Sequence, residues 1–250
     1  MFLAAGGALA ASAPGSAAAQ EANGFGEKSQ LIVSVDRLVP LLSFSSQTVT
    51  TTQGGTSLQT TDTGTSAVFL IGREPNLSVV HTVPRVAFDF VVVRHLTVGG
   101  AIAFAVGIGG KHEEELGNNN TRTTDTPNNT IFGFAPRVGY ILPFGHVIAF
   151  WPRLGFAFYS VSSKSTGQGN GGNEITTTNS DTVFSLDLDP QLTWVPVEHF
   201  FVNFGPLLNI PLTGKRSVEV VTGANTNTTK NDLSVFHFGL SAGLGGWFDL

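Results

Sequence analysis

The chain lacks several features that would place it in a common protein class. It has no cysteine, and only 12% of its 250 residues are charged, where soluble domains carry about 25%. Without cysteine there is no disulfide scaffold and no thiolate zinc site. Basic residues form no cluster and the formal net charge is -5, which excludes the positive surface that nucleic acid requires. After residue 20 no apolar run approaches the roughly 20 residues of a transmembrane helix, which excludes a helical membrane protein.

The residues that are abundant favour strands and loops. The chain contains 30 glycines and 20 phenylalanines, and most of its polar bulk is Thr, Ser and Asn. Its first residues have the pattern of a secretory signal peptide, with an apolar stretch over 2–13 and then Ala17-Ala18-Ala19. We expect cleavage after Ala19, with a disordered Ala/Gly tail as the alternative. The expected division is therefore a signal peptide over 1–19, a short periplasmic segment over 20–30, and one barrel domain over 31–250.

From Leu31 onward, apolar segments alternate with linkers of two kinds. The long linkers are rich in Thr, Asn, Gly and Ser and cover 46–66, 110–130, 162–180 and 213–232. The short linkers cover 94–95, 143–146 and 196–199. Long outer loops that take turns with tight periplasmic turns are typical of outer-membrane barrels. The sequence thus predicts a closed antiparallel transmembrane β-barrel of the all-β class.

The linkers delimit eight expected strands. They cover 31–44, 83–93, 96–108, 131–142, 147–161, 182–194, 200–212 and 233–248. An even number places both ends of the barrel domain on the periplasmic side. The apolar segments 67–72 and 77–81 could form a small hairpin in the first long linker. If they cross the membrane instead, the barrel has ten strands.

Within the expected strands the residues alternate with a period of two. In 182–194, Phe184, Leu186 and Leu188 share one face, while Asp187 and Asp189 share the other. The other strands likewise place bulky apolar residues on one face and small or charged residues on the opposite face. In a soluble barrel the large apolar side chains would fill the interior. Here they are expected to face lipid, and the charged residues to face the lumen.

The first strand and the prolines depart from this regular pattern. Adjacent charges at Asp36 and Arg37 imply a bulge or the membrane boundary. A motif of Pro-Arg-Val or Pro-Gln-Leu followed by histidine recurs about every 52 residues and suggests a duplicated hairpin. Because proline interrupts a ladder, we expect bulges or kinks at five positions. These are Pro84, Pro136, Pro152, Pro190 and Pro206.

The alternating strands and the closing segment over 236–248 resemble small outer-membrane β-barrel proteins of the OmpA/OmpX-like architecture. The segments 84–89 (PRVAFD) and 151–156 (WPRLGF) are similar to a family of largely uncharacterised outer-membrane β-barrel domain proteins. Family members end in an aromatic residue that the barrel-assembly machinery recognises, whereas this chain ends in Trp247-Phe248-Asp249-Leu250. The resemblance implies insertion into the bacterial outer membrane by that machinery, with membrane lipid as the surrounding partner.

The strongest candidate site is a set of charged residues in the lumen. Opposite charges in a narrow interior are expected to pair, because an unpaired buried charge is costly. The predicted lumen ion-pair network comprises Arg85, Asp89, Arg137, Arg153, Asp187 and Asp189. We interpret it as a plug. A selectivity ring is the alternative, although eight strands leave an interior only wide enough for side chains.

The histidines and aromatic residues suggest weaker candidates. A serine hydrolase needs a base within reach of a nucleophile, and only His237 with Ser241 or Asp187 is placed to meet in the lumen. The segment 112–115 (HEEE) could bind a cation, although a solvated acidic loop is the favoured explanation. Interfacial aromatic girdles could include Tyr140, Trp151, Tyr159, Trp194 and Trp247, with ordinary packing as the alternative.

From these patterns we expect a monomeric, non-enzymatic envelope protein with a plugged lumen and a structural or surface-interaction role. We expect no catalytic residue, no cofactor, no metal and no nucleic-acid partner. The alternatives are passage or binding of small hydrophobic molecules and, second, a lipid-modifying enzyme. A secreted soluble β-sandwich is a further possibility.

Overall fold

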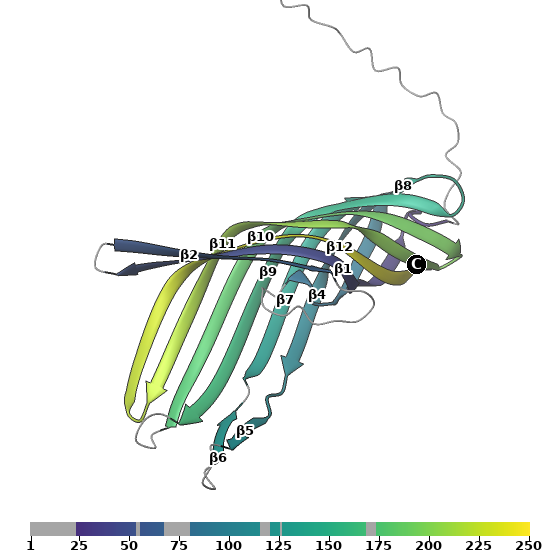
Figure 1. Ribbon diagram of the computed structural model, residues 1–250. Coiled ribbons are helices and arrows are strands. Elements are labelled where there is room, and N and C mark those ends of the chain that lie inside the picture. Colours follow the sequence, from purple (N-terminus) through teal and green to yellow (C-terminus); the bar gives the residue numbers. More distant parts are fainter. Residues whose placement is uncertain (1–23, 54–55, 68–80, 116–120, 126, 169–173) are drawn as a thin grey trace, which may run out of the picture.

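The computed structural model describes residues 24–53, 56–67, 81–115, 121–125, 127–168 and 174–250 (Figure 1). The expected signal peptide over 1–19 lies outside these residues. In the described part of the chain, no helix is long and apolar enough to cross a membrane.

Strands dominate the described residues. They are β1 (Gln30–Gln53), β2 (Thr56–Ala67), β3 (Arg85–Val93), β4 (Leu96–Gly107), β5 (Lys111–Glu115), β6 (Thr121–Asp125), β7 (Asn128–Tyr140), β8 (Leu142–Pro143), β9 (Ile148–Gln168), β10 (Glu174–Val197), β11 (Phe200–Thr222) and β12 (Asn225–Asp249). The all-β class expected from composition is confirmed.

The sheet closes into a ring of eight antiparallel strands. The order is β1, β3, β4, β7, β9, β10, β11 and β12, and β12 pairs with β1 to complete the ring. Strand β2 lies outside the ring and pairs with the second half of β1, from Leu42↔Ala67 to Gln53↔Thr56. The expected eight-stranded barrel is confirmed. Most of the residues proposed for a ninth and tenth strand, 68–80, lie outside the described part of the chain.

The long linkers were predicted wrongly as loops. The ladder between β9 and β10 continues to Gln168↔Glu174, and that between β11 and β12 continues to Thr222↔Asn225. Much of 46–66 is likewise a hairpin of β1 and β2, and part of 110–130 is the separate hairpin of β5 and β6. Figure 1 shows these hairpins extending well past the barrel. Threonine favours strands, so a Thr-rich segment with water on both faces keeps its ladder without apolar alternation.

The outer wall is apolar and the lumen is polar, as the alternation predicts. Phe88 is 48% exposed and Leu188 is 36% exposed, whereas Arg137 and Asp189 are 7% and 4% exposed. The exposed apolar side chains of the ring strands form a continuous set, which we call the apolar belt. It includes Val98, Ile102, Phe104, Phe132, Phe134, Val138, Leu154, Phe156, Phe158, Leu192, Phe204, Phe238 and Leu244.

Two further expectations are wrong in part, and the first is that of bulges at the prolines. The ladder keeps its register at Pro136, Pro152, Pro190 and Pro206, and Pro84 precedes β3. At Pro136 the bridges to β9 are missing but the pairing with Gly100 of β4 is kept, so the absent N–H is tolerated without an inserted residue.

The aromatic girdle was predicted wrongly in part. Tyr140 and Trp194 point outward and are about half exposed. Trp151, Tyr159 and Trp247 face the lumen and are buried there. In a strand, side-chain direction follows the parity of the position and not the residue type, so these three rings were assigned to the wrong face.

Candidate functional site

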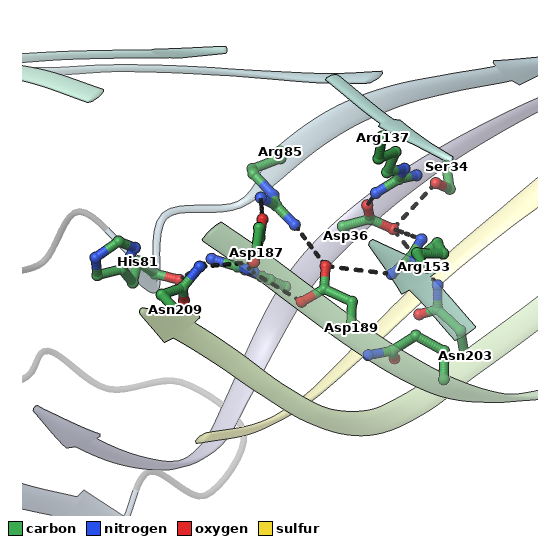
Figure 2. Close-up of polar contacts among 12 residues, drawn as sticks. Ser34, Asp36, His81, Arg85, Arg137, Arg153, Asp187, Asp189, Asn203 and Asn209 are labelled. Carbon is green, nitrogen blue, oxygen red and sulfur yellow. Dashed lines mark hydrogen bonds and ion pairs between the residues drawn. The ribbon is translucent and has the colours of Figure 1, made fainter. Parts of the chain in front are cut away.

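The six predicted lumen charges lie together in the middle of the barrel, and two further residues join them. Asp89 comes from β3. Figure 2 shows the other five, which are Arg85 of β3, Arg137 of β7, Arg153 of β9, and Asp187 and Asp189 of β10. The two that the prediction missed are Asp36 and Arg37 of β1. All eight side chains are buried. Four guanidinium groups and four carboxylates give this ion-pair network a formal charge of zero.

One half of the network is built around Arg137 and Asp36. Arg137 donates from Nε to Oδ1 of Asp89 at 2.9 Å and forms ion pairs with Asp36 and Asp89. Arg153 lies 3.1 Å from the other oxygen of Asp36 and 3.7 Å from Asp189. Each arginine therefore bridges two carboxylates on different strands.

The other half is built around the two aspartates of β10. Arg85 donates from Nη1 to Asp187 at 2.6 Å and from Nη2 to Asp189 at 2.8 Å. Arg37 approaches the same two carboxylates at 2.7 and 3.2 Å from Nη2. Asp187 and Asp189 each contact two guanidiniums here, and each of the two arginines bridges both carboxylates by charge-assisted contacts.

A bulge in β1 brings Asp36 and Arg37 to the same side. Consecutive strand residues normally face opposite ways, yet both side chains are buried in the lumen. The register between β1 and β12 shifts between Val35 and Val39, and Arg37 has a φ of 56°. The adjacent charges had suggested a bulge, and the bulge is confirmed. That signal could have placed both residues in the network.

Glycines make the space that the large charged side chains need. A Cβ on Gly99 would fall on the backbone of Phe88 and 2.6 Å from the carboxylate of Asp89. A Cβ on Gly155 would fall on the carbonyl oxygen of Pro136 and close to Arg137. At these positions only glycine allows neighbouring strands and buried charges to approach so closely.

An aromatic cluster fills the lumen at the end of the barrel that carries the short turns and the C-terminus. Phe25, from the turn before β1, inserts its ring 5.6 Å from Trp151, 5.1 Å from Phe201 and 5.2 Å from Trp247, measured between ring centroids. The side chain of Gln30 holds this turn by accepting hydrogen bonds from Gly26 and Glu27 and donating to the carbonyl of Gly24. We call Phe25, Trp151, Phe201 and Trp247 the aromatic plug.

The aromatic plug and the ion-pair network are in contact. The guanidinium of Arg153 lies over the ring of Trp151 at 4.8 Å. The four aromatic side chains are each at most 1% exposed, and the paired charges lie directly next to them. The barrel axis is therefore filled at two successive levels.

A hydrogen-bond chain leads from the ion-pair network toward the end of the lumen that lies nearer the long hairpins. Asn209 donates from Nδ2 to Asp187 at 2.6 Å, and its Oδ1 lies 3.3 Å from Nδ1 of His237. Because Asn209 donates to a carboxylate, its oxygen is left to accept from Nδ1–H of the histidine. Nε2 of His237 then accepts from the hydroxyl of Ser43, 2.7 Å away.

This chain corrects the expected partners of His237. Its serine is Ser43 of β1 and not Ser241, and it reaches Asp187 only through Asn209. The ring of His237 also stacks on that of His81 at 5.4 Å. All of these side chains are at most 3% exposed except Asp187, at 6%. Ser43 and His237 are thus arranged like a nucleophile and its base, and both are buried inside the barrel.

The remaining candidates lie elsewhere. His95 and His199 occupy two-residue turns with φ of 70° and 62°, and His146 lies in the turn before β9. The side chains of 112–115 lie outside the described part of the structure. Among the side chains that are described, no group of three or more His, Asp or Glu residues is placed to hold a metal ion.

Comparison with known proteins finds similarity to solved structures only at the level of architecture. No protein-family model matches the chain, and no curated protein matches it. The attachment invasion locus protein Ail of Yersinia pestis is 12% identical, with a TM-score of 0.35 and coverage of 89% of this chain and all of Ail. The outer-membrane protease OmpT of Escherichia coli is 11% identical, with a TM-score of 0.39 and coverage of 90% of this chain and 98% of OmpT.

The closed ring and the apolar belt characterise the protein better than these scores do. An eight-stranded antiparallel ring with lipid-compatible side chains outside and paired charges inside is the arrangement of transmembrane barrels. The fold is that of a small outer-membrane β-barrel. At such identities nothing of the activity of Ail or OmpT transfers to this chain.

Proposed function

We propose that this protein is a non-enzymatic, non-conducting barrel of the bacterial outer membrane that holds hydrophilic hairpins at the cell surface, for envelope integrity or surface contact. The observation that carries the proposal is the contrast between the two faces of the barrel wall. The outer face is apolar, whereas the lumen is filled by a neutral ion-pair network and the aromatic plug.

The outer face supports the membrane location. An arginine on the lipid face near the bilayer midplane costs roughly 2–4 kcal/mol, and the four arginines at mid-barrel point into the lumen. Beyond the apolar belt, β9 to β12 continue as Thr-, Ser- and Asn-rich ladders. Such residues are expected in water, beyond the lipid headgroups.

The filled lumen supports a structural role over transport. Ions would have to pass the aromatic plug and then separate buried charge pairs. Passage of small hydrophobic molecules along the axis, an alternative role, would meet the same two obstacles. The hairpins that project past the membrane are then the part of the protein most available to a partner.

Two measurements test the proposal, one on cells that express the chain and one on the purified protein. Heat-modifiable migration on a denaturing gel, together with recovery in outer-membrane fractions, is expected for an inserted barrel. In planar bilayers the protein should produce no steady conductance steps. Sustained porin-like steps would contradict the plugged lumen, and complete recovery in a soluble fraction would contradict the membrane location.

One observation favours a second candidate, an acyl hydrolase. Ser43, His237 and Asn209 have the hydrogen-bond order in which a histidine base activates a serine. A fluorophosphonate probe distinguishes the two roles. Labelling of the wild type that is lost in Ser43→Ala would favour the hydrolase, and equal absence of labelling in both would favour the non-enzymatic barrel.

A further inference from the structure

The outer wall of the barrel carries a hollow of about 510 Å³. It lies where the β1–β2 hairpin bends away from the β11–β12 hairpin, a divergence visible in Figure 1. Pockets that hold small ligands typically have a volume of about 300–1,000 Å³. The hollow is separate from the ion-pair network and from the Ser43–His237 chain.

Two interruptions in strand pairing create this hollow. Strands β11 and β12 pair as far as Asn209↔His237 and resume at Lys215↔Asp232, so β11 bulges between these points. The pairing of β1 with β12 ends at Thr50↔Asp232. The wall therefore changes curvature at Asp232, and the outward bend of the β1–β2 hairpin makes the outer surface concave there.

The hollow lies at the rim of the apolar belt that is nearer the long hairpins. On the same strands, nearer the middle of the barrel, Phe44 and Ile210 are exposed apolar side chains, and Leu212 in the lining is also exposed. At the level of the hollow itself, Lys215 and Asp232 are about two-thirds exposed. A change from lipid-compatible to hydrated side chains within a few residues marks the headgroup level of the outer leaflet.

The lining is rich in hydroxyl groups and close to neutral. Thr48, Thr213 and Ser234 supply hydroxyls, Gln59 supplies an amide, and Lys215 is paired with Asp232. A phosphate would need a cation that is not already paired. A sugar has alternating hydroxyl donors and acceptors that match hydroxyl, amide, carboxylate and ammonium groups, and the apolar faces of a sugar ring suit Pro211 and Leu212.

We propose that this hollow binds the oligosaccharide headgroup of a glycolipid in the outer leaflet. The inference rests on the membrane location of the proposed function and adds a ligand class to it. The position of the hollow indicates that the sugar belongs to a lipid. A glycolipid whose sugar lies at the rim of the apolar belt can keep its acyl chains beside Leu212 and Phe44. A free oligosaccharide would gain no such apolar contact.

The test uses the full-length protein in nanodiscs and two substitutions of the same kind. Ser234→Trp fills the hollow from the outer face of β12. Ser180→Trp is the matched control, because Ser180 is an exposed serine on the β10 extension, away from the hollow. The probes are rough lipopolysaccharide, lipid A without core sugars, and free core oligosaccharide, with retained lipid measured by native mass spectrometry.

The wild type should retain the sugar-bearing lipid at least about tenfold more strongly than lipid A, equivalent to about 1.4 kcal/mol. Ser234→Trp should abolish this preference, and Ser180→Trp should keep it. Asp232→Asn should weaken retention without unfolding the barrel, because an exposed ion pair contributes little stability.

Two outcomes would overturn the inference: no preference over lipid A in the wild type, or equal retention by Ser234→Trp. Equally tight binding of the free oligosaccharide would overturn the lipid source. Heat-modifiable migration of the same samples separates the two proposals. An inserted barrel without glycolipid preference refutes the hollow alone, whereas failure to insert refutes the membrane location.

Discussion

Breaking the pair of Asp89 and Arg137 tests whether the lumen charges are mutually compensating. In Asp89→Asn the side chain keeps its shape but loses its charge, so Arg137 retains only Asp36 and the network carries an excess positive charge. Breaking one partner of a buried pair costs about 3–5 kcal/mol. We expect a loss near the lower end, about 3 kcal/mol, because Asp36 still compensates Arg137 in part.

The double variant makes the prediction specific. Adding Arg137→Met removes the excess charge and leaves three arginines and three aspartates, with Asp36 still paired to Arg153. The free energy of unfolding of Asp89→Asn/Arg137→Met should therefore exceed the value expected from adding the two single losses. We expect a coupling energy of about 2 kcal/mol in the double-mutant cycle.

Reversible urea unfolding in phospholipid vesicles, followed by tryptophan fluorescence, measures these free energies. Asp232→Asn, which breaks an exposed pair, is the control and should change stability by about 0.5 kcal/mol or less. A cost below about 1 kcal/mol for Asp89→Asn, or a double variant as unstable as the sum of the single variants, would refute the compensation argument.

Three further predictions concern the barrel wall and one turn, and two of them have a matched control substitution. Gly155→Ala should destabilise the barrel by roughly 1–3 kcal/mol because the new Cβ would meet a carbonyl of β7. Gly167→Ala is the control and should be tolerated, because the space around Gly167 is open. Equal unfolding midpoints for the two variants would contradict this. Phe134→Arg in the apolar belt should lower the free energy of unfolding in vesicles by roughly 2–4 kcal/mol. Phe144→Arg, at a turn, is the control and should lower it by at most about 1 kcal/mol. The reverse order would exclude lipid contact at position 134. Burial and a neighbouring arginine lower the pKa of His95 below its ordinary 6.5, so folding favours the neutral ring and stability falls as pH drops below about 6.5. His95→Asn, which tolerates the φ of 70°, should reduce that fall in acid urea titrations, and an unchanged pH dependence would contradict the assignment.

The sequence alone favoured eight strands over ten, and it determined the antiparallel order and the face of most side chains. These follow from local rules: a period of two assigns Phe88 and Asp189 to opposite faces, and short turns pair each strand with the next. The six lumen charges could be named because a charge on the lipid face is too costly at mid-barrel.

The long polar linkers show where a local rule failed. A Thr-rich segment without apolar alternation was interpreted as a loop, yet β9 to β12 continue through it as paired strands. Pairing is a property of two segments together, so neither segment by itself indicates whether a partner lies beside it. The hollow beside Asp232 also depends on this pairing and on where it stops.

Only the tertiary structure decided which lumen residues meet. A backbone bulge at Arg37 puts two consecutive charges inside, and ring closure brings Ser43 of β1 to His237 of β12, although 194 positions separate them. The sequence determines which face a side chain occupies, since that depends on parity and transfer energy. Its partner across the lumen depends on strand stagger and closure of the whole ring.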